Sequence, residues 1–97
     1  MGVRGRLNMN TAPVFLERMA QVVESGRRQV IVDLGEVELV DSSGIGALIN
    51  STRQVRRQGG DLRLARPNRR MQVLLDVTYL HDLFRTYDDV DKALTDT

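Results

Sequence analysis

The sequence contains no cysteine and no tryptophan, and its only aromatic residues are two phenylalanines and two tyrosines among 97 residues. Without cysteine the chain has no disulfide framework, no thiolate metal ligand and no cysteine nucleophile, which is typical of a protein in a reducing compartment. With so few aromatic side chains, the core must be built from leucine, valine, isoleucine and methionine. The composition therefore excludes thiol chemistry and a disulfide-stapled fold.

Long hydrophobic runs are also missing, and the longest apolar runs are only a few residues, too short to span a membrane. No apolar stretch follows the charged N-terminus, Met1–Arg6, as a secretory signal would require, so we expect a cytoplasmic protein. His81 is the single histidine, and the scattered aspartates supply no cluster of metal ligands around it. We expect no metal, no cofactor and no membrane partner.

The net charge is only +1, but the charges are unevenly distributed. Seven arginines and one aspartate fall between Arg53 and Arg70, whereas six aspartates, one arginine and one lysine fall between Asp76 and Thr97. A basic patch is one way of binding nucleic acid. Because this stretch has no aromatic residues for base stacking, we favour a solvated helix face and expect no specific binding of nucleic acid.

Apolar strand patterns alternate with helical patterns, which predicts an α/β fold: a small mixed sheet of about four strands with about four alternating helices. Strands are expected at residues 3–7, 30–34 and 62–65 and in a short segment that ends near Tyr87. We expect the pair Gly35-Glu36 to turn the chain after the second strand, and Val37, Leu39 and Val40 to run on toward the next helix.

Helix boundaries follow from capping residues. Thr11 is a candidate N-cap with Pro13 in the first turn, and Gly26 ends that helix. A second helix is expected to follow residues 41–44 and to end at Gly59-Gly60. Pro67 opens a third helix. Asp88 or Asp89 caps a final helix whose apolar residues are expected to face inward: Val90, Ala93 and Leu94.

The most informative stretch is Asp41-Ser42-Ser43-Gly44-Ile45-Gly46, where an apolar strand gives way to a helix. The carboxyl end of a strand in an open α/β sheet is where ligands and partners usually bind. Asp41, Ser42 and Ser43 are all good N-cap types, and glycines let a partner or another backbone approach closely. Spacing alone favours the simpler interpretation, a capped helix start with small residues for tight packing.

Electrostatics favour a second interpretation of this stretch. A phosphate on a serine at the helix start would add a charge of about −1.5 to −2 at neutral pH. The helix macrodipole and the free N–H groups of the first turn favour negative charge there, so we expect the fold to tolerate the modification. A partner that docks over this surface with its own carboxylates would be repelled by the phosphate. Phosphorylation here would therefore switch binding without switching folding.

Enzymatic interpretations of the motif find little support. A hydrolase nucleophile elbow needs G-x-S-x-G, and Val40 stands where its first glycine would be. No G-x-x-x-x-G-K-[ST] phosphate loop is present, and Gly44-Ile45-Gly46 alone is too weak a signal for a dinucleotide site. We expect His81 to be a surface or helix-end residue rather than a general base. The chain is therefore expected not to be an enzyme, and no catalytic residue is assigned.

The motif at residues 41–46 resembles the signature of STAS domains, specifically of the bacterial anti-sigma factor antagonists. Other segments fall where that family has them: residues 5–8, 11–13, 30–34, 59–64 and 84–88. The resemblance covers about residues 3–95 and implies a single STAS-like domain over residues 1–97.

The resemblance also implies a mechanism. In that family the dephosphorylated protein binds an anti-sigma factor that is also a serine kinase, which frees the sigma factor. The kinase phosphorylates the serine after the motif's aspartate, here Ser42, and a metal-dependent serine phosphatase removes the phosphate. ATP and metal belong to those partners. By position, the expected partner-binding residues are Asp41, Ser43, Gly44, Ile45, Gly46 and Asn8.

The sequence departs from the family pattern in two places. Asn8 stands where the family commonly has an acidic residue, which removes one charge near the expected acceptor. The chain also has room for one strand before the first helix where the family usually has two. An open sheet edge invites pairing, so a homodimer is a hypothesis beside a monomer. A non-switching STAS module, either a scaffold in a stress complex or an accessory subunit of a transporter, is the alternative function.

Overall fold

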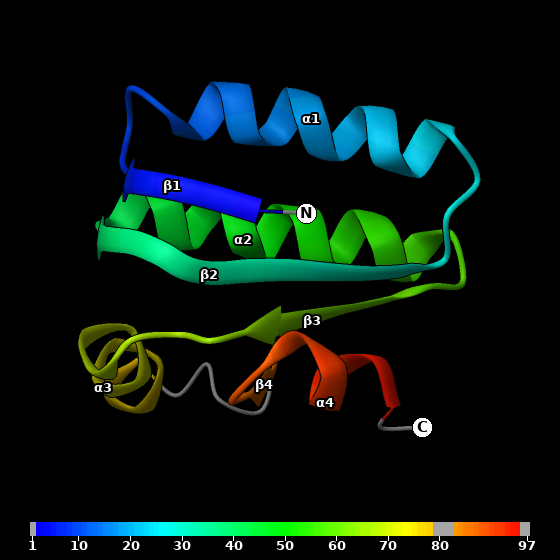
Figure 1. Ribbon diagram of the computed structural model, residues 1–97. Coiled ribbons are helices and arrows are strands. Elements are labelled where there is room, and N and C mark those ends of the chain that lie inside the picture. Colours follow the sequence, from blue (N-terminus) through cyan, green and yellow to red (C-terminus); the bar gives the residue numbers. More distant parts are fainter. Residues whose placement is uncertain (1, 79–82, 96–97) are drawn as a thin grey trace.

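The computed structural model describes residues 2–78 and 83–95 and has an α/β fold (Figure 1). Strands and helices alternate along the chain, and the described strands form one sheet in the order β1-β2-β3-β4. The strands are β1 (Gly2–Leu7), β2 (Gln29–Val40), β3 (Asp61–Ala65) and β4 (Arg85–Tyr87). The helices are α1 (Ala12–Glu24), α2 (Ser42–Arg57), α3 (Arg69–Val77) and α4 (Val90–Thr95). The predicted fold class, with four strands and four helices, is confirmed.

Strand pairing in the described residues is parallel throughout, so the expectation of a mixed sheet was wrong in this detail. The physical reason is that a helix lies between each strand and the next and carries the chain back to the same edge, whereas antiparallel neighbours are usually joined by a tight hairpin. As a result the carboxyl ends of β1 and β2 lie side by side, and Leu7 pairs with Val40 there.

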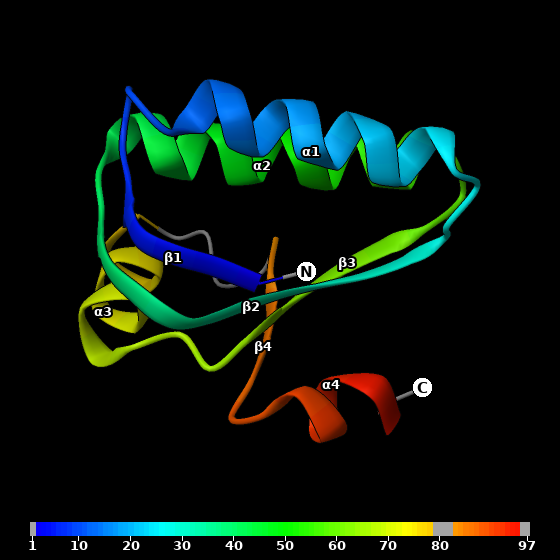
Figure 2. The ribbon, with the colours of Figure 1, turned by 45° about the horizontal axis from the view of Figure 1, so that its top comes forward.

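The sheet is covered on both faces (Figure 2). Helices α1 and α2 pack against each other on one face, and α4 contacts β2, β3 and β4. The core between the layers is aliphatic, as the composition predicts, and includes the fully buried Met19, Leu48 and Leu64. On α4, Ala93 is buried, but Leu94 is 57% exposed, so the expectation that Leu94 faces inward was wrong.

Most predicted helix ends are confirmed. Gly26 follows α1 with a φ of +87°, a left-handed conformation that suits glycine, and Asp89 accepts a hydrogen bond from the Lys92 N–H at 2.7 Å to cap α4. Thr11 does precede α1, but its side chain makes no capping bond. Its hydroxyl instead donates to the Arg6 carbonyl at 2.7 Å, which ties the start of α1 back to β1.

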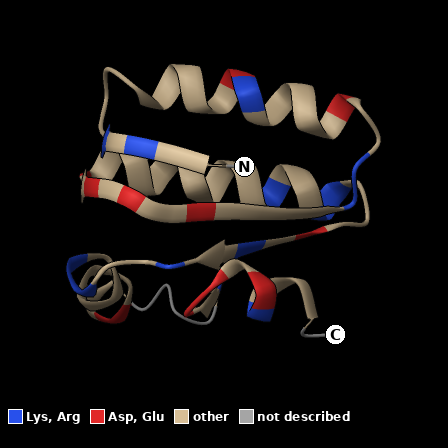
Figure 3. Cartoon of the chain, in the orientation of Figure 1, with Lys and Arg blue, Asp and Glu red and all other residues tan. Residues whose placement is uncertain are grey.

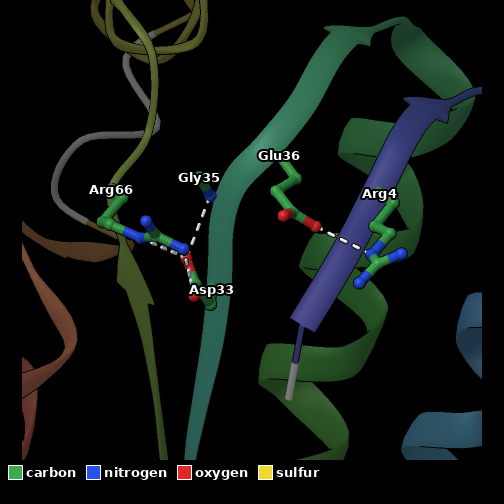
Figure 4. Close-up of polar contacts among 5 residues, drawn as sticks. All are labelled: Arg4, Asp33, Gly35, Glu36 and Arg66. Carbon is green, nitrogen blue, oxygen red and sulfur yellow. Dashed lines mark hydrogen bonds and ion pairs between the residues drawn. The ribbon is translucent and has the colours of Figure 1, made fainter.

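The turn expected at Gly35-Glu36 is absent, because β2 continues as one strand to Val40. Gly35 lies instead at a close contact between β2 and the residue after β3. Arg66, after β3, lies over Gly35 and donates hydrogen bonds of 2.8 and 2.6 Å to the Asp33 carboxylate (Figure 4). A Cβ on Gly35 would overlap the Arg66 guanidinium. Gly35 therefore makes room for the Arg66 guanidinium, which a side chain at this position would push aside.

The hydrogen bond from Arg66 is the main reason why the pKa of Asp33 lies below its ordinary value of 3.8. A carboxyl group whose pKa is lowered on folding stabilises the fold above that ordinary value, and the stabilisation is lost as the pH falls through the folded pKa. We expect the melting temperature to fall as the pH is lowered below about 4. Asp33→Asn should be less stable than the wild type at pH 7 and lose less on acidification.

Thermal unfolding followed by circular dichroism between pH 7 and pH 3 measures both effects. The control is Glu17→Gln on α1, which removes an exposed carboxylate that has no ion pair among the described residues. Equal acid sensitivity in the wild type and Asp33→Asn would contradict the assignment.

Candidate functional site

Three segments meet at the carboxyl edge of the sheet: the end of β1, the end of β2 and the start of α2 (Figure 2). The backbone N–H of Asp41 donates to the Leu7 carbonyl at 3.2 Å, which extends the pairing of β1 with β2 by one residue. The chain then enters α2 at Ser42. The motif recognised in the sequence therefore lies at a junction of two strands and a helix.

Asp41 is the residue that caps α2. Its backbone is extended, with φ −103° and ψ −173°, and its carboxylate accepts a hydrogen bond from the Gly44 N–H at 3.0 Å. The first turn is completed when the Ile45 N–H donates to the Asp41 carbonyl at 3.0 Å. Ser42 is thus the first helical residue rather than a cap, and its side chain is exposed, while Ser43 is half-buried.

The two glycines of the motif, Gly44 and Gly46, differ in the space around them. An added Cβ on Gly44 would overlap the Leu7 carbonyl oxygen, so Gly44 allows β1 and α2 to touch backbone to backbone. An added Cβ on Gly46 would meet open space. Gly44 and Ile45 are both buried, so in this conformation neither offers a surface to a partner. The close approach that the sequence predicted is made within the chain.

Asn8 lies beside this junction and shapes the loop between β1 and α1. Its side-chain oxygen accepts hydrogen bonds from the N–H groups of Asn10 at 2.9 Å and Thr11 at 3.2 Å. A hollow of about 290 Å³ brings Asn8 next to Asp41 and is also lined by Arg6, Leu39 and Val40. Leu39, 43% exposed, was not among the predicted site residues, although its place two residues before the motif was the available signal.

Charges of both signs act at the start of α2. The helix has 16 residues, no acidic side chain in its first turn and Arg56 and Arg57 in its last turn. Its macrodipole places a partial positive charge at Ser42, opposed by the capping carboxylate of Asp41. An anion on Ser42 would therefore meet free backbone N–H groups at the favourable end of the helix.

The arginine-rich stretch does not form one surface. Arg63 is 7% exposed and donates to Asp61 at 3.1 Å and to the Ala93 carbonyl at 2.6 Å. Arg66 is bound to Asp33. The remaining members divide between α2, whose basic end lies away from the motif, and the start of α3 (Figure 3). Tertiary contacts thus split what looked like a single basic patch.

Residues 2–78 and 83–95 contain no group of three or more histidine, cysteine, aspartate or glutamate side chains placed to hold a metal ion. His81 lies outside the described residues. Among the helices that the structure describes, none has the length and apolar character needed to cross a membrane.

The sequence model of the STAS domain matches residues 1–93. This chain belongs to the STAS domain family. This STAS domain is 30% identical over 83 residues to the anti-sigma-B factor antagonist of Bacillus subtilis (strain 168), a match that covers 86% of this chain and 75% of the relative.

Solved structures agree with the assignment. The crystal structure of an anti-sigma factor antagonist from Mycobacterium paratuberculosis has a TM-score of 0.86 at 26% identity and covers 97% of this chain and 80% of that one. The Bacillus cell fate determinant SpoIIAA in its phosphorylated form has a TM-score of 0.74 at 17% identity and covers 96% and 84% of the two chains. At that identity the second likeness shows the fold alone.

The two motif glycines provide a matched test of the junction. We expect Gly44→Ala to lower the free energy of unfolding by about 1–3 kcal/mol, because the new methyl group must displace backbone atoms of Leu7. Gly46→Ala should raise it by about 0.5–1 kcal/mol, because alanine is the better helix former and space is open there. Urea denaturation measures both, and equal effects of the two substitutions would contradict the described contact.

Proposed function

We propose that this STAS domain is an anti-sigma factor antagonist whose binding is switched by phosphorylation of Ser42. In the unmodified state it binds an anti-sigma factor that is also a serine kinase. That kinase phosphorylates Ser42 with its own bound ATP, and the modified protein no longer binds. A serine phosphatase restores the binding state. The anti-sigma factor antagonists among the relatives support the class of partner.

The observation that carries the proposal is the division of roles between Asp41 and Ser42. Asp41 supplies the capping carboxylate, and Ser42 is an exposed first residue whose hydroxyl makes no hydrogen bond within the described residues. Esterifying that hydroxyl therefore removes no interaction on which the helix depends.

The charge of the phosphate explains why binding is sensitive when folding is not. The start of α2 offers the phosphate the positive end of the helix dipole and free N–H donors, which offset repulsion by the neighbouring Asp41 carboxylate, so we expect the free protein to accommodate a charge of about −1.5 to −2. In a complex the same group would have to be desolvated against the partner, which is strongly unfavourable unless a cation pairs with it. The kinase surface that covers Ser42 is therefore expelled after its own reaction.

The residues around Ser42 shape recognition of this site. Asp41 and Ser43 flank the acceptor, and Gly46 leaves open space one turn along α2. Asn8 contributes no charge, and its side-chain oxygen is occupied by the loop before α1. We propose that the partner contacts Asp41, Ser43, Gly46 and Asn8 around the acceptor, and that the buried Gly44 and Ile45 act only by holding this arrangement.

Phosphorylation is tested directly with the anti-sigma kinase from the same genome, Mg²⁺-ATP and mass spectrometry. We expect one phosphate on Ser42, none on Ser42→Ala, and phosphate still on Ser42 in Ser43→Ala, which loses a flanking contact but keeps the acceptor. The phosphoprotein and Ser42→Asp should bind the kinase at least about tenfold more weakly than the unmodified chain. Phosphate on Ser43 alone, or none from a kinase that hydrolyses ATP, would refute the proposed switch.

A second measurement separates switching from unfolding. The free energies of unfolding of the phosphorylated and unmodified proteins should agree within about 0.5 kcal/mol, as for a surface change away from packing contacts. A large loss of stability would mean that the phosphate acts by disrupting the fold.

A further inference from the structure

Helix α3 has two apolar faces, and only one of them is used by the core. Met71 and Leu75 are buried, with 4% and 2% of their surface exposed. On the outer side, Val73 and Val77 are 51% and 69% exposed, and their spacing of four residues places them on one stripe. In Figure 1, α3 lies beside the end of β2, at the edge of the sheet where α2 begins.

The stability of α3 does not explain this outer face. Valine is a weaker helix former than most straight-chain residues, and these two valines bury little surface in return. Arg69 and Arg70 occupy the first turn, where the helix macrodipole disfavours cations and where no acidic residue is present. Both arginines are exposed, and neither has an ion pair within the described residues. All four residues thus work against the helix while remaining available to a partner.

The outer face is continuous with the Ser42 site through three adjoining hollows. The first, of about 610 Å³, lies on α3 and is lined by Arg69, Arg70, Val73, Leu74 and Val77. The second, of about 230 Å³, shares Arg70 and Leu74 with the first and adds Leu39 and Val40 of β2. The third contains Leu39, Val40 and Asp41, the residue before Ser42. One surface therefore runs from α3 to Asp41, next to the proposed phospho-acceptor Ser42.

The position of α3 against this edge is held by specific contacts. The Asn68 side chain accepts a hydrogen bond from the Met71 N–H at 2.8 Å, which caps α3, and donates one to the Val37 carbonyl of β2 at 3.0 Å. The pair of Arg66 with Asp33 anchors the preceding loop to the same strand. The outer face is thus presented in a fixed relation to Ser42, which lowers the ordering cost of binding.

We propose that the outer face of α3 is the second half of the docking surface for the anti-sigma factor, an inference that rests on the proposed function. The complementary patch on the partner is apolar at its centre, to cover Val73 and Val77, and carries carboxylates at its rim, to pair with Arg69 and Arg70. A second copy of this chain is a poorer occupant, because it would bring the same arginines against each other. Phosphate on Ser42 then acts at one end of a longer interface.

The test measures binding of the full chain to the anti-sigma kinase by isothermal titration calorimetry. Val73→Glu and Arg70→Glu should each weaken binding at least about tenfold, since Val73→Glu places a carboxylate against the apolar centre of the partner's patch and Arg70→Glu places one against its acidic rim. Leu94→Glu on α4 and Val14→Glu on α1 are matched controls, because these side chains are 57% and 58% exposed, close to Val73. The controls should bind within about twofold of the wild type. Circular dichroism verifies that every variant is folded.

The possible results separate this inference from the proposed function. If the wild type does not bind the kinase at all, both fail together. If Ser42→Asp loses binding but Val73→Glu and Arg70→Glu bind like the wild type, the function stands and the role of α3 is refuted. Equal losses in the two controls would also refute it, because the effect would then be one of net charge. A wild-type dimer that Val73→Glu dissociates would assign the face to a second copy instead.

Discussion

The backbone contact between Leu7 and Gly44 is the constraint on which the site depends. Gly44 allows α2 to begin directly against the Leu7 carbonyl, and the same carbonyl accepts the N–H of Asp41. One oxygen atom at the end of β1 therefore positions both the cap and the first turn of the helix. These contacts with β1 fix the buried side of the start of α2, while Ser42 remains exposed.

In this arrangement the residues that stabilise α2 are different from the proposed site of modification, Ser42. The helix depends on the carboxylate of Asp41 and on the burial of Gly44, Ile45 and Leu48, and none of these changes when the Ser42 hydroxyl is esterified. A protein of this size has only about 5–15 kcal/mol of net stability, so a modification that removed a large part of it would raise the unfolded fraction. Separate residues for capping and for modification avoid that conflict.

Polar contacts also fix the segment between β3 and α3. Asp33, Gly35 and Arg66 fasten this loop to β2, and Asn68 both caps the helix and holds the strand. With its position set by polar contacts at its start and by Met71 and Leu75 inside, α3 can carry a second apolar stripe on its outer face. The proposed docking surface is therefore carried by regular elements that the fold itself fixes.

Local patterns were enough for the α/β class, the helix ends at Gly26 and Asp89 and the position of the motif at residues 41–46, because periodicity, capping chemistry and strand composition act over a few neighbouring residues. Only the tertiary structure decided that Asp41 rather than Ser42 is the cap, that Gly44 faces Leu7, and that Gly35 makes room for Arg66 instead of turning the chain. It also decided that the arginine-rich stretch is divided between two helices and internal ion pairs. These outcomes depend on contacts between residues distant in sequence. A glycine, for example, is compatible with a turn and with a close tertiary contact, and only the residue that packs against it distinguishes the two.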